Sequence, residues 1–232
     1  MADDLEASVG RVEEPAAPLP LEPVARFVLA ERLAHWTYAA FFVISFISGL
    51  LMWVPATREW MSGARHAVTH YHGGAGLLMV VVPLVVLLIL DRRRLFSDLR
   101  EVDVWDGDDR RWFWAALRGR TLRGAEMPPQ GRLNAGQKAN AVLVAAMAVG
   151  FLLTGSLLMV REDLPSWLVS RALWLHGFLA IAGVALLAGH LAHVFLTRHG
   201  RDYLRAMVGG ALRGELARER HRKWWEKSRT GL

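Results

Sequence analysis

Four long segments of this 232-residue chain carry almost no charged side chains, and they constrain its fold more than any other feature. A helix that crosses a bilayer needs about 20 predominantly apolar residues in a row. In chain order the four segments are 33–54, 72–90, 139–160 and 173–197. The sequence therefore predicts an all-α, multi-pass membrane protein, a bundle of four transmembrane helices.

Basic residues are concentrated in some of the connections between these segments and are scarce in others. Residues 92–138 contain eleven Arg and Lys residues, whereas residues 56–71 and 161–171 contain two each. Because basic residues near spans stay in the cytoplasm, both termini and the long connection are predicted to be cytoplasmic. The net charge of +6 then reflects topology and contact with anionic lipid, so we expect no nucleic acid partner.

The regions outside the spans differ in composition. Residues 1–24 mix acidic residues with Ala and Pro, which predicts a flexible N-terminal tail. Residues 25–200 form the predicted four-helix domain, and residues 201–232 are predicted to be a basic cytoplasmic C-terminal tail. Within the long connection, RRWFWAALRGR at 110–120 is amphipathic and is expected to lie along the lipid headgroups.

The fourth apolar segment contains histidines, which are expensive inside a membrane span and indicate function. His176 and His190 are fourteen residues apart, which on a helix is about 21 Å along the axis and nearly the same face. His193 would project about 100° away from His176, so it does not share the helix face of His176 as closely as His190 does.

Two further histidines stand at the starts of spans, at depths that match these two. His35 begins the first span at the predicted cytoplasmic face, and His72 begins the second at the external face. The predicted topology therefore sets His72 level with His176, and His35 level with His190. Two pairs at two depths indicate two metal centres stacked across the membrane.

The chain contains no cysteine, which restricts the chemistry of any metal centre. This absence excludes cysteine-ligated iron–sulfur clusters, C-x-x-C-H haem attachment, disulfides and thiolate catalysis. Histidine nitrogen is then the simplest ligand, and we expect two b-type haems (heme b), each with its iron bound by two histidines.

Alternatives exist for several of these residues. His70 competes with His72, although it projects about 160° away on the helix, and His193 competes with His190. Glycines in the spans would either let a flat macrocycle approach or serve helix packing: these are Gly49, Gly73, Gly76 and Gly155. We expect no ligand role for the remaining histidines, His66, His199 and His221. No hydrolytic triad, Glu-x-x-His or phosphate-loop pattern stands in a suitable context.

Several short motifs share an order along the chain with a known family. They are ERLAHW at 31–36, HGGAG at 72–76, NAGQK at 134–138, TG at 154–155 and LHGFLAIAGVALLAGH at 175–190. From about Arg26 to Lys227, this combination resembles the cytochrome b (gamma) subunit of respiratory formate dehydrogenases.

The resemblance implies that His72 and His176 hold an outer haem, and that His35 and His190 hold an inner one. It also implies a quinone pocket beside the inner haem that uses Asn134 and Gln137, with Gly49 nearby. Amide side chains suit this task because they can hydrogen-bond a quinone carbonyl without adding charge.

The same resemblance implies a location in the bacterial inner membrane, partners and a role. An external molybdenum or tungsten subunit would oxidise formate, and an iron–sulfur subunit would pass electrons to the outer haem. The chain would be the electron-transfer and quinone-reducing subunit of an oxidoreductase complex in anaerobic respiration, and not a complete enzyme alone.

Two other readings stay open at this point. Cytochrome b subunits of nickel–iron hydrogenases and of other molybdenum oxidoreductases have similar helices, so the electron donor is not fixed. A haem-free membrane anchor, or a transporter whose histidines relay protons, would belong to a different class of protein.

Overall fold

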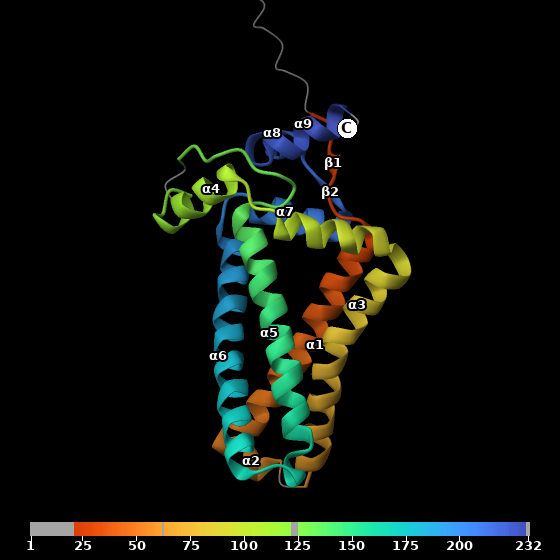
Figure 1. Cartoon of the computed structure of the whole chain (residues 1–232), viewed down its shortest axis with the longest axis vertical. Helices are drawn as coiled ribbons and strands as arrows, with labels where there is room; N and C mark the ends of the chain where they lie inside the picture. Colours follow the sequence, from red (N-terminus) through yellow and green to blue (C-terminus); the bar gives the residue numbers. More distant parts are fainter. Residues whose placement is uncertain (1–20, 62, 122–124, 231–232) are drawn as a thin grey trace, which may run out of the picture.

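The computed structural model describes residues 21–61, 63–121 and 125–230, and the four predicted spans are four long helices of one bundle (Figure 1). The helices are α1 (Leu29–Trp53), α3 (Arg65–Asp103), α5 (Ala135–Met159) and α6 (Ser166–Leu196). Helix α3 packs against both α1 and α5, and α5 packs against α6. The predicted all-α, four-span fold is confirmed, and each helix begins before its apolar segment does.

The bundle turns most of its large apolar side chains outward. Leu196 is 83% exposed and Ile89 is 75% exposed, although both lie in spanning helices. Exposed apolar surface of this extent is unfavourable in water and favourable against lipid hydrocarbon. Within a membrane, helices associate through small residues, so the large apolar side chains can face the lipid. The outer surface of the bundle is therefore a lipid-facing surface.

Helix α3 continues beyond the predicted end of its span and breaks at Asp91. The backbone there is extended, with φ −158° and ψ 75°, and the Asp91 carboxylate accepts a hydrogen bond from the Arg94 amide at 2.9 Å. An Asp that accepts from a backbone amide in this way starts a new helical segment. The long polar connection thus begins as helix, and after it α4 (Gly107–Leu117) contains most of the amphipathic RRWFWAALRGR stretch.

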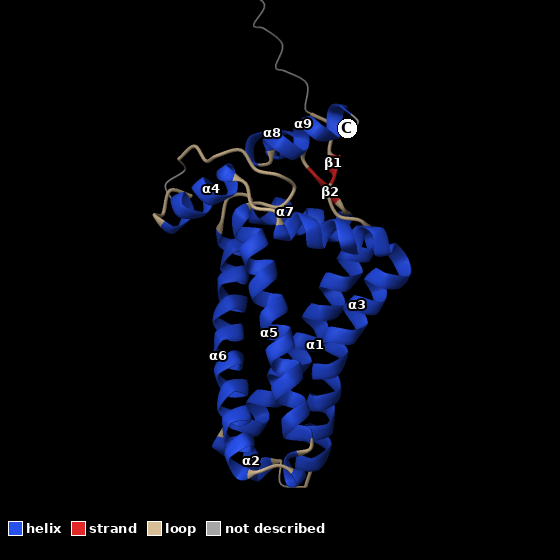
Figure 2. Ribbon diagram, in the orientation of Figure 1, coloured by secondary structure: helices blue, strands red, loops and turns tan. Residues whose placement is uncertain are grey.

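Both described ends of the chain lie at the same end of the bundle as α4, and we call this the polar end (Figure 2). Strands β1 (Val24–Ala25) and β2 (Ala211–Leu212) pair there in antiparallel fashion. The remaining polar-end helices are α7 (Gly200–Gly209), α8 (Gly214–Arg220) and α9 (Arg222–Thr230). The opposite end holds α2 (Pro55–Trp60) and the short helix η1 (Arg161–Asp163).

The C-terminal segment, which by composition alone is a basic tail, folds onto the polar end. We call residues 21–28 and 200–230 together the cap. Its core consists of four buried apolar residues, Ala206, Leu212, Leu216 and Ala217, against which Phe27 and Trp224 pack. Residues 1–20 of the predicted N-terminal tail lie outside the described residues. The cap therefore joins the two ends of the described chain over the helix bundle.

Candidate functional site

The first of two histidine pairs joins α3 and α6 toward the short-loop end. The ring centres of His72 and His176 are 6.0 Å apart, with an angle of 68° between the ring planes. His72 and His176 are 104 residues apart in the chain, and the packing of the helices brings their rings together. The structure thus brings together the two histidines that the depth argument pairs at the predicted outer site.

Hydrogen bonds fix the orientation of both rings in this pair. Nδ1 of His72 lies 3.0 Å from the main-chain oxygen of Ser45 and 3.0 Å from the hydroxyl of Ser48. Nδ1 of His176 lies 2.8 Å from the hydroxyl of Thr154. A carbonyl oxygen can only accept, so Nδ1 of His72 carries the proton and its Nε2 is left with a lone pair. This is the arrangement found in metal-binding histidines, whose second ring nitrogen bonds to a carbonyl or hydroxyl group.

The second pair joins α1 and α6 toward the polar end. The ring centres of His35 and His190 are 6.3 Å apart, with an angle of 56° between the ring planes. His190 is exposed although its ring faces His35, so protein side chains do not close around this pair. The structure again brings together the two residues that the sequence pairs by depth.

The spacing within each pair fits one metal ion between two rings. A bond from a metal to an imidazole nitrogen is about 2 Å long, so rings on opposite sides of one ion have centres about 6 Å apart. The observed 6.0 Å and 6.3 Å agree with this geometry. Among the described residues no group of three or more His, Asp or Glu could hold a metal ion. Two axial histidines suit an iron whose other ligands come from a macrocycle, as in haem.

Glycines face both rings of the first pair from neighbouring helices. A Cβ at Gly49 on α1 would lie 3.1 Å from Cε1 of His72, and one at Gly155 on α5 would lie 3.8 Å from Cε1 of His176. The expectation that Gly49 lies near the inner haem and its quinone pocket is therefore wrong. Gly49 follows His35 by fourteen residues, and the helical rise over this distance is about 21 Å. Gly49 therefore lies near the opposite end of α1 from His35.

Asn134 and Gln137 lie at the start of α5, at the polar end. They form a capping box, in which the Asn134 side chain accepts from the Gln137 amide at 2.9 Å. In return, the Gln137 side-chain oxygen accepts from the Asn134 amide at 3.0 Å. Both amide oxygens are thus engaged in starting the helix, and the NH2 group of each side chain is the part that could donate to a quinone carbonyl.

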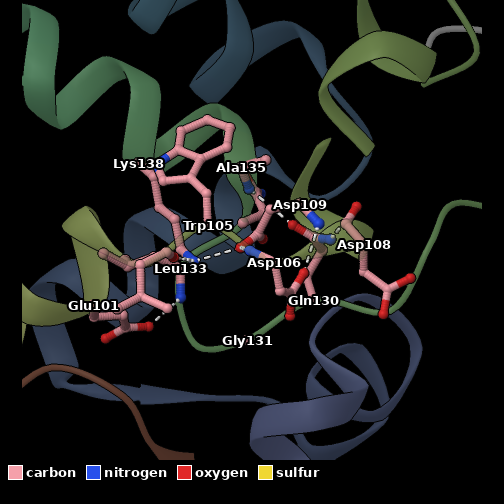
Figure 3. A network of polar contacts seen from close by, with 12 residues as sticks. Glu101, Trp105, Asp106, Asp108, Asp109, Gln130, Gly131, Leu133, Ala135 and Lys138 are labelled. Atoms are coloured by element: carbon pink, nitrogen blue, oxygen red, sulfur yellow. Dashed lines mark hydrogen bonds and ion pairs between the residues drawn. The ribbon is translucent and has the colours of Figure 1, made fainter. Parts of the chain in front are cut away.

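A polar network around α4 fixes the segment that leads into α5 (Figure 3). Lys138 donates to Asp109 at 2.7 Å and to the main-chain oxygen of Val104 at 2.9 Å. The Leu133 amide donates to Glu101 at 2.9 Å, and the Ala135 amide donates to the side-chain oxygen of buried Gln130 at 2.8 Å. The start of α5 is consequently tied to α3 and α4 by side chains that are themselves mostly buried.

The cap closes over this segment through a buried arginine and a buried histidine. Arg26 is 2% exposed and donates to the Arg132 main-chain oxygen at 2.7 Å and to Gln137 at 3.0 Å. Nδ1 of His221 lies 2.8 Å from the main-chain oxygen of Gly131, so its Nε2 accepts from Arg26 at 3.2 Å and from the Tyr203 hydroxyl at 3.1 Å. Burial, and then the nearby Arg26 charge, lower the pKa of His221 to about 3, so this histidine is neutral at physiological pH.

The other histidines lie outside the two pairs. His193 packs its ring 6.3 Å from Tyr203 of the cap. His66 and His70 are exposed and contact each other, with their Nε2 atoms 2.9 Å apart. His199 lies 3.7 Å from Asp202, and His221 belongs to the cap. None of these rings faces one of the paired histidines at a comparable ring-centre distance among the described residues.

Two hydroxyl residues that orient the first pair are not among the site residues predicted from the sequence. Ser48 and Thr154 are buried polar residues within apolar spans, and that contrast was a usable signal. The contact between Arg26 and His221, which are 195 residues apart in the chain, is likewise absent from the prediction. Nothing in the local sequence of either residue indicates the other.

Four apolar helices that carry two pairs of facing histidines have the architecture of a membrane cytochrome b. Residues 26–210 match the family described as prokaryotic cytochrome b561, and this match covers most of the chain. The chain therefore belongs to the prokaryotic cytochrome b561 family, a family of membrane proteins that bind b-type haem.

Curated relatives are also similar to the chain over most of their length. The chain is 24% identical over 213 residues to the formate dehydrogenase cytochrome b556(Fdo) subunit of Escherichia coli strain K12, covering 90% of this chain and 94% of the relative. It is 22% identical over 212 residues to the nitrate-inducible formate dehydrogenase cytochrome b556(Fdn) subunit of the same strain, covering 88% and 91%. As a family member with four apolar helices, the chain is a multi-pass protein of the bacterial inner membrane.

Proposed function

We propose that this chain is the cytochrome b subunit of a formate dehydrogenase complex and that it binds two b-type haems. The observation that carries the proposal is the pairing of His72 with His176 and of His35 with His190 at ring-centre distances of 6.0 Å and 6.3 Å. The names of the similar relatives support formate dehydrogenase as the complex. In it, the partners would be a molybdenum or tungsten catalytic subunit and an iron–sulfur subunit.

The chain's own residues would hold and tune the two sites. The four histidines would supply the axial ligands, and the hydroxyl and carbonyl groups on Nδ1 of His72 and His176 would fix the tautomer and raise ligand basicity. When bound, b-type haem supplies one-electron chemistry through its iron. His176 and His190 lie about 21 Å apart along α6, so this single helix would connect the two halves of the electron path.

We place quinone reduction at the polar end, near the start of α5. The NH2 groups of Asn134 and Gln137 could donate to a quinone carbonyl while their oxygens keep the helix cap. The network through Lys138 and Asp109 would keep this segment rigid. With the polar end in the cytoplasm, as the basic residues indicate, electrons would enter at the external face and protons would be taken up inside.

Haem spectra of purified variants test the ligand assignment. We expect His190→Ala to lose one b-type haem and quinone reduction while the other haem is retained, and His193→Ala to retain both. His193 is the matched control because it lies about one helical turn from His190 on α6, while its ring packs against Tyr203 and not against His35. Two intact haems in His190→Ala would show that another residue is the ligand.

The donor and the quinone contacts need separate assays. The purified complex should reduce its haems with formate and should not do so with hydrogen. Reduction by hydrogen alone would favour the cytochrome b of a nickel–iron hydrogenase, and a haem-replete preparation without a reduced b-type band would favour a haem-free anchor or transporter.

Asn134→Ala and Gln137→Ala should slow quinone turnover with haem content unchanged. Unaltered kinetics would remove both residues from the pocket.

A further inference from the structure

A cation without a counter-ion lies beside the second histidine pair. Arg32 is in the first turn of α1, three residues before His35, so the two side chains project from neighbouring positions on one side of the helix. The side chain is half-buried, and its Nε atom is buried with no hydrogen-bond partner. Within the part of the chain that the structure describes, no ion pair or hydrogen bond involves its guanidinium group.

This lack of a partner is not caused by a shortage of acidic groups. Glu31, the preceding residue, binds Arg132 at 2.8 Å and Arg94 at 3.2 Å. Asp98 binds the same two arginines, at 2.5 Å and 3.2 Å. Glu31 and Asp98 therefore form ion pairs with other arginines, and neither pairs with Arg32.

The guanidinium of Arg32 lies beside Gly210 of the cap. Gly210, at the C-terminal end of α7, has φ +94°, and a Cβ there would lie 3.3 Å from Nη1 of Arg32. Glycine is needed at 210 for this backbone conformation and leaves room for the arginine. The negative end of the α7 dipole favours a cation nearby, but that effect is only about 0.3–1 kcal/mol and does not replace a counter-ion.

We propose that Arg32 binds a propionate carboxylate of the haem that His35 and His190 ligate. This inference rests on the proposed function, because it requires a haem at that pair. Guanidinium binds carboxylate in a paired, bidentate geometry, and a half-buried arginine gains most from such a partner. The phosphate of an anionic lipid has the same chemistry and could reach the polar end, so the experiment has to separate the two sources.

Redox titration of the two haems in the intact complex tests this assignment. A cation beside a haem stabilises its reduced form, so we expect Arg32→Gln to lower the midpoint potential of the inner haem and to leave the outer haem unchanged. Arg32→Lys should restore part of the shift. Arg100→Gln is the matched control, since Arg100 is an exposed arginine of the same polar end, and it should move neither potential. The inner haem is assigned through its loss in His190→Ala.

The same variants are titrated after removal of lipid in detergent and again in phosphatidylglycerol vesicles. An Arg32-dependent shift in both conditions supports the propionate, whereas a shift only in the vesicles assigns Arg32 to lipid phosphate and overturns the proposal. Unchanged potentials in Arg32→Gln, with both haems present, overturn it as well. If Arg32→Gln does not retain haem, the infrared redox difference spectrum of Arg32→Lys with propionate-labelled haem decides, and an unshifted carboxylate band contradicts the contact. A wild-type complex without two haems would instead refute the proposed function.

Discussion

The hydroxyl of Thr154 lies 2.8 Å from Nδ1 of His176 and at the same time donates to the main-chain oxygen of Gly150 at 2.7 Å. Because its own proton is used in the bond to Gly150, the hydroxyl oxygen must accept the proton of the histidine. A third-span residue without any charge therefore sets the tautomer of a histidine on the fourth span.

This bond predicts a change at one haem alone. Thr154→Val keeps the size of the side chain but removes the acceptor, which makes His176 a less basic ligand. We expect the midpoint potential of the outer haem to rise. Haem affinity at that site should fall about tenfold or more, as is typical when a residue that hydrogen-bonds to a metal ligand is replaced. Potentiometric titration of the purified variant measures both haems. An inner haem that shifts equally would indicate a global change and contradict this explanation.

The space beside His72 gives a second prediction. A side chain at Gly49 would meet the His72 ring, since even a Cβ atom would lie 3.1 Å from Cε1. Gly49→Leu should therefore displace the ring and abolish the outer haem band while the inner band is retained. Gly76→Ala on α3 is the control, because nothing lies within 4 Å of a Cβ at that position. A full outer band in Gly49→Leu would show that the ring has room to move.

The buried ion pair between Lys138 and Asp109 predicts a stability effect. Their side chains are 8% and 5% exposed, so removing one partner leaves a buried charge without compensation. We expect Lys138→Met to lower the free energy of unfolding by about 3–5 kcal/mol. The double variant Lys138→Met with Asp109→Leu should recover most of the loss. Thermal unfolding in detergent, followed by circular dichroism, measures all three proteins. A double variant that is no more stable than the single one would argue against an uncompensated charge as the cause.

The cap should loosen at acid pH because of His221. Burial, and then the charges of Arg26 and Arg220, lower the pKa of His221 to about 3 in the folded protein. An unfolded histidine titrates near pH 6.5, so the stabilisation is complete above about 6.5 and decreases as the pH falls toward 3. Between pH 7.5 and pH 5 the loss amounts to about 2 kcal/mol.

Hydrogen exchange of the cap amides measures this loosening. We expect faster exchange in residues 203–225 at pH 5 than at pH 7.5, after correction for the intrinsic rates. His221→Asn cannot take up a proton, so its exchange should not accelerate between these two pH values. Equal acceleration in wild type and variant would assign the effect to other groups.

The fold and the pairing of the histidines followed from simple sequence properties. Segment length predicts the four spans that the helices confirm, and successive spans start at alternate ends of the bundle. The rise per residue and the rotation per residue of an α-helix then set the depths of His176 and His190, which match the depths of His72 and His35. A spanning helix is nearly a straight rod, so the depth of a residue can be counted from the end of the span.

The errors and omissions concern contacts that depend on several segments at once. Gly49 was assigned to the wrong end of its helix because family resemblance was followed instead of the helical rise. The cap escaped notice because its buried residues, such as Leu212 and Leu216, are few and lie within a strongly charged segment. Its pairing with residues near Arg26 spans almost the whole chain, and such contacts leave no local pattern.

Helix α6 supplies one member of each histidine pair, and it is the last of the four spans to be synthesised. A ribosome that has released only the first three spans has placed His35 and His72 in the membrane without their counterparts. Neither pair can form until residues 176 and 190 have been inserted, and then both become available together. A prematurely terminated chain that lacks α6 would thus reach the membrane with neither histidine pair.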